Sequence, residues 1–323
     1  MRTLRIIRNS TVSAATLAAL ALLFTGASVW AVSPGEKGLI IFTANPTGSS
    51  QIYTINPDGS NMVQITKLPP TKQEGLQPTF SPDGRRILFS YGAGSAGPDL
   101  YLINSDGTGL TQLTFDGLSS AGRWSPDGSR IVFAQTSTLS GVNVIISMRA
   151  DGEGKKTALT SIFWDSYAPA YTPDGRHIVY YSQQGGLLEA VWIMDADGSE
   201  KKRLTPASLE LFPYDVSPDG QHILMWNHNS TSLPTSIFVM NIDGTDIDRL
   251  THSPGHHDLD PSYSPDGTRI VFASDRLSSN ASLDLFTMNA DGSDIKRIAT
   301  GLTVGGCPDQ NCVTPRWGPK TTN

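Results

Sequence analysis

Asp-Gly pairs recur along this chain at a spacing that few folds can accommodate. From Asp58 to Asp291, eleven of the twelve such pairs follow one another at intervals of 21 to 25 residues, and Asp116-Gly117 falls outside this series. They alternate between Ser-Pro-Asp-Gly and Asn-x-Asp-Gly contexts, with a few variants, so the full repeat is 44 to 47 residues long. Pro, Asp and Gly suit successive positions of a tight turn. Each pair is therefore expected to join two antiparallel strands, which gives four strands per repeat.

A run of three hydrophobic residues follows each Pro-Asp-Gly turn, and a sixth copy precedes the first Asp-Gly pair. Neighbouring strand residues face opposite ways, so these strands must be covered on both faces. The blades of a β-propeller provide such cover. We predict an all-β fold, a six-bladed β-propeller of four-stranded blades. The hydrophobic runs begin at Ile40, Ile87, Ile131, Ile178, Ile223 and Ile270.

The two ends of the repeat region favour a closed ring. The first repeat starts at its second strand, 39–43, and the segment Pro315–Pro319 is similar to Gly122–Pro126. We therefore predict that the C-terminal strand joins the N-terminal blade, which leaves no open edge. The alternative is an open β-solenoid or a pair of sandwiches, whose end units would need caps. The predicted domain is a single propeller over 38–319, followed by a tail at 320–323.

The first 31 residues have the order of a secretory signal peptide. Arg2, Arg5 and Arg8 precede a run of hydrophobic and small residues, and small residues stand at the expected cleavage positions. A retained membrane anchor is the alternative. We expect cleavage, a short linker over 32–37, no stable membrane insertion afterwards, and a periplasmic or secreted protein. The net charge of −6 and the lack of a Lys and Arg block argue against nucleic-acid binding.

Two segments of the last repeat, Pro261–Arg276 and Asp284–Ser293, resemble the propeller repeat of the TolB family. The resemblance extends over about 38–319 and implies a six-bladed propeller in the bacterial cell envelope. It also implies an envelope protein partner, such as a peptidoglycan-associated protein, because TolB bridges such partners in the Tol-Pal system. TolB carries an α/β domain ahead of its propeller, and we expect none here. Ala93–Gly97 lacks the first glycine of a hydrolase nucleophile elbow, which argues against a serine peptidase.

The segments that link one blade to the next are expected to gather at one end of the central channel. Several acidic residues lie on them, and ordinary solvated carboxylates are the alternative interpretation. Aromatic side chains on the same segments are candidate anchors for a partner. The candidate partner-binding residues are Glu74, Phe163, Trp164, Asp165, Glu210, Phe212, His256, His257, Asp258 and Asp260.

Metal chemistry is the main alternative for this region. His252, His256, His257, Asp258 and Asp260 offer imidazole and carboxylate groups, but their spacing matches no standard ligand motif. We therefore expect no metal and no cofactor. Cys307 and Cys312 are the two cysteines of the chain, and a small-loop disulfide is expected in an oxidising compartment.

The sequence thus predicts a non-enzymatic binding scaffold, expected to be a monomer, that holds a protein partner at the loop-rich channel mouth. Two other functions stay open. One is a metal-assisted hydrolase or lyase that acts on a polysaccharide or a peptide. The other is a module that binds a glycan or a small ligand.

Overall fold

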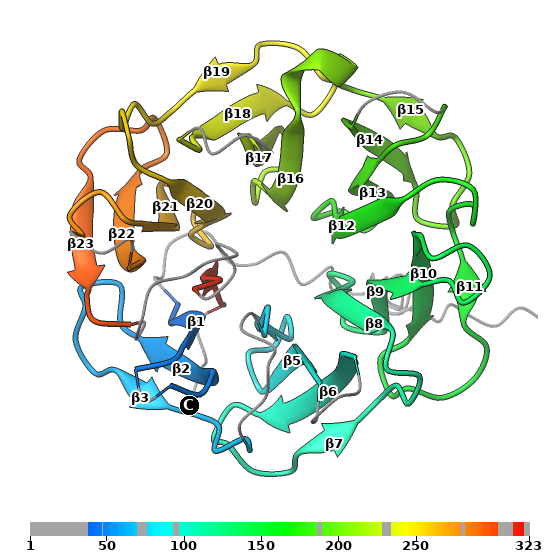
Figure 1. Cartoon of the computed structure of the whole chain (residues 1–323), viewed down its shortest axis with the longest axis horizontal. Helices are drawn as coiled ribbons and strands as arrows, with labels where there is room; N and C mark the ends of the chain where they lie inside the picture. The colour runs from blue at the N-terminus through cyan, green and yellow to red at the C-terminus, as the bar shows by residue number, and fades with distance from the viewer. Residues whose placement is uncertain are drawn as a thin grey trace, which may run out of the picture.

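The computed structural model of this chain is a ring of six four-stranded antiparallel sheets around a central axis (Figure 1). It describes residues 38–46, 48–69, 76–92, 97–185, 189–227, 234–278, 282–302 and 313–319. The predicted six-bladed propeller is confirmed. The proposed signal peptide, linker and tail, together with Glu74, Cys307 and Cys312, lie outside the described residues.

Each blade places its first strand at the axis and its fourth strand at the rim. Blade 1 comprises β24 (Arg316–Trp317), β1 (Ile40–Ala44), β2 (Gln51–Ile55) and β3 (Val63–Gln64). Blades 2 and 3 comprise β4 (Thr79–Phe80), β5 (Arg86–Tyr91), β6 (Asp99–Asn104), β7 (Thr111–Gln112), β8 (Ser119–Trp124), β9 (Arg130–Thr136), β10 (Asn143–Arg149) and β11 (Thr157–Ala158). Blades 4 to 6 comprise β12 (Ser166–Tyr171), β13 (His177–Ser182), β14 (Ala190–Asp195), β15 (Lys202–Arg203), β16 (Leu211–Val216), β17 (His222–Asn227), β18 (Ile237–Asn241), β19 (Asp248–Arg249), β20 (Asp258–Tyr263), β21 (Arg269–Ser274), β22 (Asp284–Asn289) and β23 (Lys296–Ala299).

The hydrophobic runs lie on the second strand of each blade and are buried on both faces, as predicted. In β21, for example, Ile270, Val271 and Phe272 are all fully buried. Neighbouring blades supply the cover, because the side chains of one sheet pack against the next around the ring. The rim strands are shorter than expected: the ladder ends at Gln64 in blade 1, and Thr66 instead accepts a hydrogen bond from the backbone N–H of Ile52.

The Ser-Pro-Asp-Gly turns share one hydrogen-bonding arrangement. In blade 3 the Ser125 hydroxyl donates to Oδ1 of Asp127 at 2.5 Å and accepts from the backbone N–H of Arg130 at 2.9 Å. Gly128 takes the left-handed backbone conformation at φ 69°, which suits glycine. The hydrogen bond from Ser125 holds the pKa of Asp127 below its usual value. The turns are thus fixed by side-chain chemistry as well as by proline.

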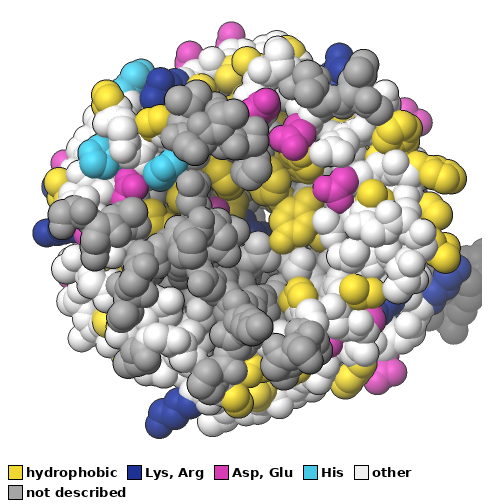
Figure 2. Space-filling view, in the orientation of Figure 1, with side chains coloured by type: hydrophobic (Ala, Val, Ile, Leu, Met, Phe, Trp, Pro, Cys, Tyr) yellow, Lys and Arg dark blue, Asp and Glu magenta, His cyan; other side chains and the backbone are white. Residues whose placement is uncertain are grey.

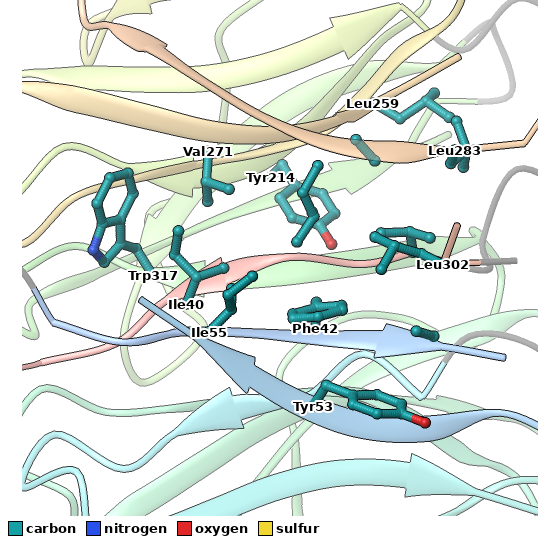
Figure 3. Close-up of a cluster of buried hydrophobic side chains, with 14 of the residues drawn as sticks. Ile40, Phe42, Tyr53, Ile55, Tyr214, Leu259, Val271, Leu283, Leu302 and Trp317 are labelled. Carbon is teal, nitrogen blue, oxygen red and sulfur yellow. The ribbon is translucent and has the colours of Figure 1, made fainter. Parts of the chain in front are cut away.

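The ring closes where the two ends of the repeat region meet. β24 pairs antiparallel with β1, with Trp317 opposite Ile40 and Arg316 opposite Ile41. The indole N–H of Trp317 also donates to the carbonyl of Gly38 at 2.9 Å. Around this seam, hydrophobic side chains of blades 1, 5 and 6 form one cluster (Figure 3). The predicted closure by a C-terminal strand is confirmed.

The innermost strands are bent by β-bulges. The register shifts in β8, β12, β16 and β20, between Ser120 and Arg123 in the first of these. A bulge adds one residue to its strand and re-aims the side chains that follow. This shift decides which side chains face the axis. Among the described residues the helical element is a single 3-10 turn, η1 (Ala207–Leu209), and no described helix is long and hydrophobic enough to cross a membrane.

Candidate functional site: the two mouths of the channel

The channel has two ends with different construction. We call one end the loop mouth, where the described interblade segments 115–118, 161–165, 206–210 and 252–257 lie. We call the other end the turn mouth, where the Ser-Pro turns and their equivalent in blade 1 meet. Every innermost strand runs from the loop mouth to the turn mouth. The predicted binding residues belong to the loop mouth or to the strands that start there.

An aromatic cluster forms part of the wall of the loop mouth. The ring of Phe212 lies 5.0 Å from Tyr181, 5.7 Å from Trp226 and 6.0 Å from Tyr167, measured between ring centroids. Such separations give favourable aromatic contacts. The strands β12, β13, β16 and β17 bring these side chains together at the ends that face the loop mouth. Phe212 is half-buried and thus belongs to the wall rather than to a projecting loop.

Exposed hydrophobic side chains are concentrated on the same face. Of the ten large hydrophobic side chains that are exposed in the described part, six lie on loops of this face, and the other four lie near the rim. Phe163 is 77% exposed. Ile162 on the same interblade segment and Leu209 on the next one are also exposed. Figure 2 shows this face, with hydrophobic surface inside the central hollow and carboxylates beside it. Trp164 is half-buried next to Phe163.

The acidic residues of this face differ in how free their carboxylates are. Asp165 is half-buried and accepts the backbone N–H of Asn143 at 2.7 Å. Glu210 is half-buried and ends η1 in the left-handed conformation, with φ 46°. Asp116 is held by Ser119 and by Lys156, at 2.8 and 3.1 Å. Glu210 and Asp165 therefore flank the aromatic wall from neighbouring blades.

The histidine cluster splits into a surface part and a buried part. His256 and His257 are half-buried, and both approach Asp275: Nδ1 of His256 lies 3.5 Å from its Oδ1, which accepts the backbone N–H of His257 at 2.7 Å. Asp258 is fully buried and pairs with Arg276 at 2.7 Å. In the part of the chain that the structure describes, no group of three or more His, Cys, Asp or Glu side chains converges to hold a metal ion.

Asp260 lies inside the protein rather than at the surface. It is 3% exposed, its backbone is left-handed at φ 53°, and its Oδ2 has no hydrogen-bond partner among the described residues. Burial raises the pKa of this carboxyl to about 7, although the positive charges of Arg316 and Arg123 oppose the shift. Asp258 and Asp260 thus have no exposed carboxylate to offer a partner at the loop mouth.

The turn mouth contains a cavity that the sequence analysis did not single out. Its volume is about 300 Å³. Prolines from all six blades surround it, together with the aromatic residues that precede the turns. Arg123, Asp215 and Arg316 also line it. Buried next to these charges, Tyr214 places its ring 3.8 Å from the guanidinium carbon of Arg316 and 5.8 Å from that of Arg123. The prolines are Pro82, Pro126, Pro173, Pro218, Pro265 and Pro319.

The family model of the TolB beta propeller domain matches residues 23–212 and 211–322. The chain belongs to the TolB β-propeller family. A TolB homolog of Chlorobium luteolum is 29% identical over 48% of this chain and 34% of its own length. The Tol-Pal system protein TolB of Francisella tularensis subsp. mediasiatica is 26% identical over 70% of this chain and 52% of its own length. The match thus spans about a third to a half of these curated relatives.

A solved structure gives the same fold. The crystal structure of TolB from Acinetobacter baumannii superposes with a TM-score of 0.71 and 24% sequence identity, covering 89% of this chain and 68% of that one. At this identity the likeness concerns the propeller fold. The chemistry of the two mouths depends on the residues of this chain itself.

Proposed function

We propose that this TolB-like propeller is a non-enzymatic binding scaffold of the cell envelope, which holds a protein partner at its loop mouth. The observation that carries the proposal is the exposed Phe163 beside an aromatic wall. Exposed hydrophobic groups gathered on one face of a protein mark an interaction surface. Aromatic residues near the centre of such a surface contribute most of the binding energy.

The family supports the choice of partner class. The relative from Francisella is a Tol-Pal system protein by name, and a peptidoglycan-associated protein of the envelope is the partner that we propose. The location in the periplasm belongs to the same proposal. Loop carboxylates such as Glu210 would orient a partner that carries basic groups, since charge complementarity speeds association and selects partners.

The test is site-specific crosslinking in the native envelope. A photoreactive amino acid replaces Phe163 at the loop mouth or, as the matched control, Leu110, which is exposed near the rim. We expect crosslinks to a peptidoglycan-associated protein from position 163 and none from position 110. Purified components should then bind, and Phe163→Ala should weaken that binding about tenfold. Equal crosslinking from both positions, or no binding between the purified proteins, would overturn the proposal.

A further inference from the structure

The turn mouth repeats one backbone pattern six times, yet its charges do not follow the sixfold symmetry. Six prolines, one from each blade, line the cavity, and so does the residue three positions before each of them. Two of these six residues are cationic, one is anionic and three are uncharged. In blade order from β24 they are Arg316, Thr79, Arg123, Ala170, Asp215 and Ser262. The cationic residues come from blades 1 and 3, so they reach the cavity from different sides.

Among the described residues, the two guanidinium groups have more N–H donors than hydrogen bonds. Arg316 is 6% exposed; one of its terminal nitrogens donates to the carbonyl of Tyr214 at 2.7 Å, and its Nε has no partner among the described residues. Arg123 donates to the carbonyl of Gly122 at 2.9 Å. A guanidinium presents several N–H donors and no acceptor. A buried donor without a partner costs free energy that an added acceptor recovers.

Positive charge is also in excess beside the cavity. The neighbouring charge of Arg316 adds to burial in lowering the pKa of Arg123 to about 10, which still leaves it protonated at neutral pH. Asp215 lies 3.7 Å from Arg316, but its Oδ2 already accepts from the Ser262 hydroxyl and the Tyr263 backbone at 2.8 and 2.9 Å. The second carboxyl near the arginines, that of Asp260, titrates near pH 7 and is then only partly charged.

We infer that the cavity of the turn mouth binds a small monocarboxylate between the guanidinium groups of Arg123 and Arg316. The planar fork of arginine matches a carboxylate in shape and charge. A bound carboxylate also supplies acceptor oxygens for the guanidinium donors. The walls of proline and of the aromatic side chains of Trp124 and Trp317 suit a compact hydrophobic body behind that carboxylate. This site is separate from the loop mouth and does not depend on a protein partner there.

The experiment is calorimetric titration of the purified protein with acetate, butyrate and benzoate, and with benzamide as the neutral analogue of benzoate. We expect at least one carboxylate to bind and benzamide not to bind. Arg123→Gln should lower the affinity about tenfold, because it removes one charged donor group. The control is Arg176→Gln, which removes the same charge from an exposed position that does not line the cavity. It should leave the affinity within about twofold.

A second variant keeps the inference testable if one substitution disturbs the fold. Arg316→Gln alters the seam as well as the cavity, so both variants are first checked for an unchanged circular dichroism spectrum. If the Arg123→Gln protein is folded and has lost carboxylate binding, that result supports the site even when Arg316→Gln does not fold. Binding of benzamide as tightly as benzoate, preference for inorganic phosphate, or retention of carboxylate affinity in Arg123→Gln would each overturn it. Binding only of peptides with a free C-terminus, and of no small acid, would also overturn it.

Discussion

Each of the six blades contributes to both mouths of the channel, but the two mouths are built differently. At the turn mouth, proline, aspartate and a serine or threonine fix the backbone segment in blades 2 to 6, and these blades differ in only a few side chains. At the loop mouth the described interblade segments differ from one another, and only one of them contains the turn η1, before Leu211. The turn mouth thus has a repeated, hydrogen-bonded construction and a shaped cavity, whereas the loop mouth has a varied surface, which we propose to be the recognition surface.

The largest expected effect lies at the seam that borders the turn mouth. Trp317→Ala should lower the free energy of unfolding by about 3 to 5 kcal/mol, because it empties part of a buried cluster and removes the bond to Gly38. Trp164→Ala, the corresponding change at the half-buried loop mouth, should cost less than half as much. Chemical denaturation of both variants measures the difference. Equal losses would mean that the two mouths contribute equally to stability.

The next effect concerns pH and the carboxyl group between the mouths. The folded pKa of Asp260 is raised to about 7 from an ordinary 3.8, so folding favours its protonated form. Its contribution to stability is complete below about pH 4 and is lost as the pH rises through 7. We expect the free energy of unfolding to fall by on the order of 2 kcal/mol between pH 5 and pH 8 from this group.

Asp260→Asn should flatten that pH dependence. Asp165→Asn, at the half-exposed loop mouth, should leave it in place. Denaturation curves recorded at several pH values compare the slopes, whatever the absolute stability of each variant. An unchanged slope in Asp260→Asn would show that another group dominates this pH range.

A smaller effect is expected in a single turn. Ser125→Ala removes one hydrogen bond to Asp127 and one from the backbone of Arg130, and should cost about 1 kcal/mol. This hydrogen bond lowers the pKa of Asp127. Part of the stabilisation that the hydrogen bond gives is therefore present at neutral pH and is lost as the pH falls below about 4 and the carboxylate becomes protonated. The gap between wild type and variant should therefore narrow in acid. Ser137→Ala on a loop of the opposite face, where the hydroxyl accepts one exposed bond, should change stability by less than about 0.5 kcal/mol.

The smallest expected effect on stability is at the tip of the loop mouth. Phe163→Ala removes a side chain that is 77% exposed, so the melting temperature should stay within about 1 °C of the wild type. Differential scanning calorimetry checks this value. The same protein should show the loss of partner binding described above. A clear drop in melting temperature would place Phe163 in the packed structure instead of the recognition surface.

Much of the fold could be predicted because each repeat contains recognisable turn residues and a strand that is hydrophobic on both faces. The pairing of Trp317 with Ile40 followed from the similarity between the last residues and the Arg123–Pro126 segment. The same similarity also places Arg123 and Arg316, the two arginines of the cavity, at equivalent positions of their blades.

The chemistry inside the channel could not be predicted for a physical reason. Alternation along a strand normally tells which side chains face the axis, and a β-bulge resets that alternation. In β20 the shift between Leu259 and Ser262 turns Asp260, expected at the loop mouth, into a buried group. A sequence-level signal did exist: aligning the six turns on their prolines sets the cationic and anionic positions apart from their uncharged equivalents.

The seam has a mechanical consequence for the ring. Each blade is joined to the next by continuous polypeptide, whereas within blade 1 the strand β24 is held to β1 by a two-residue ladder and a few neighbouring bonds. A pull applied across the ring would load the covalent junctions without breaking them and would peel this ladder residue by residue. Tension would therefore open the molecule at one fixed place, between β24 and β1 next to Trp317, before the other five blades unravel.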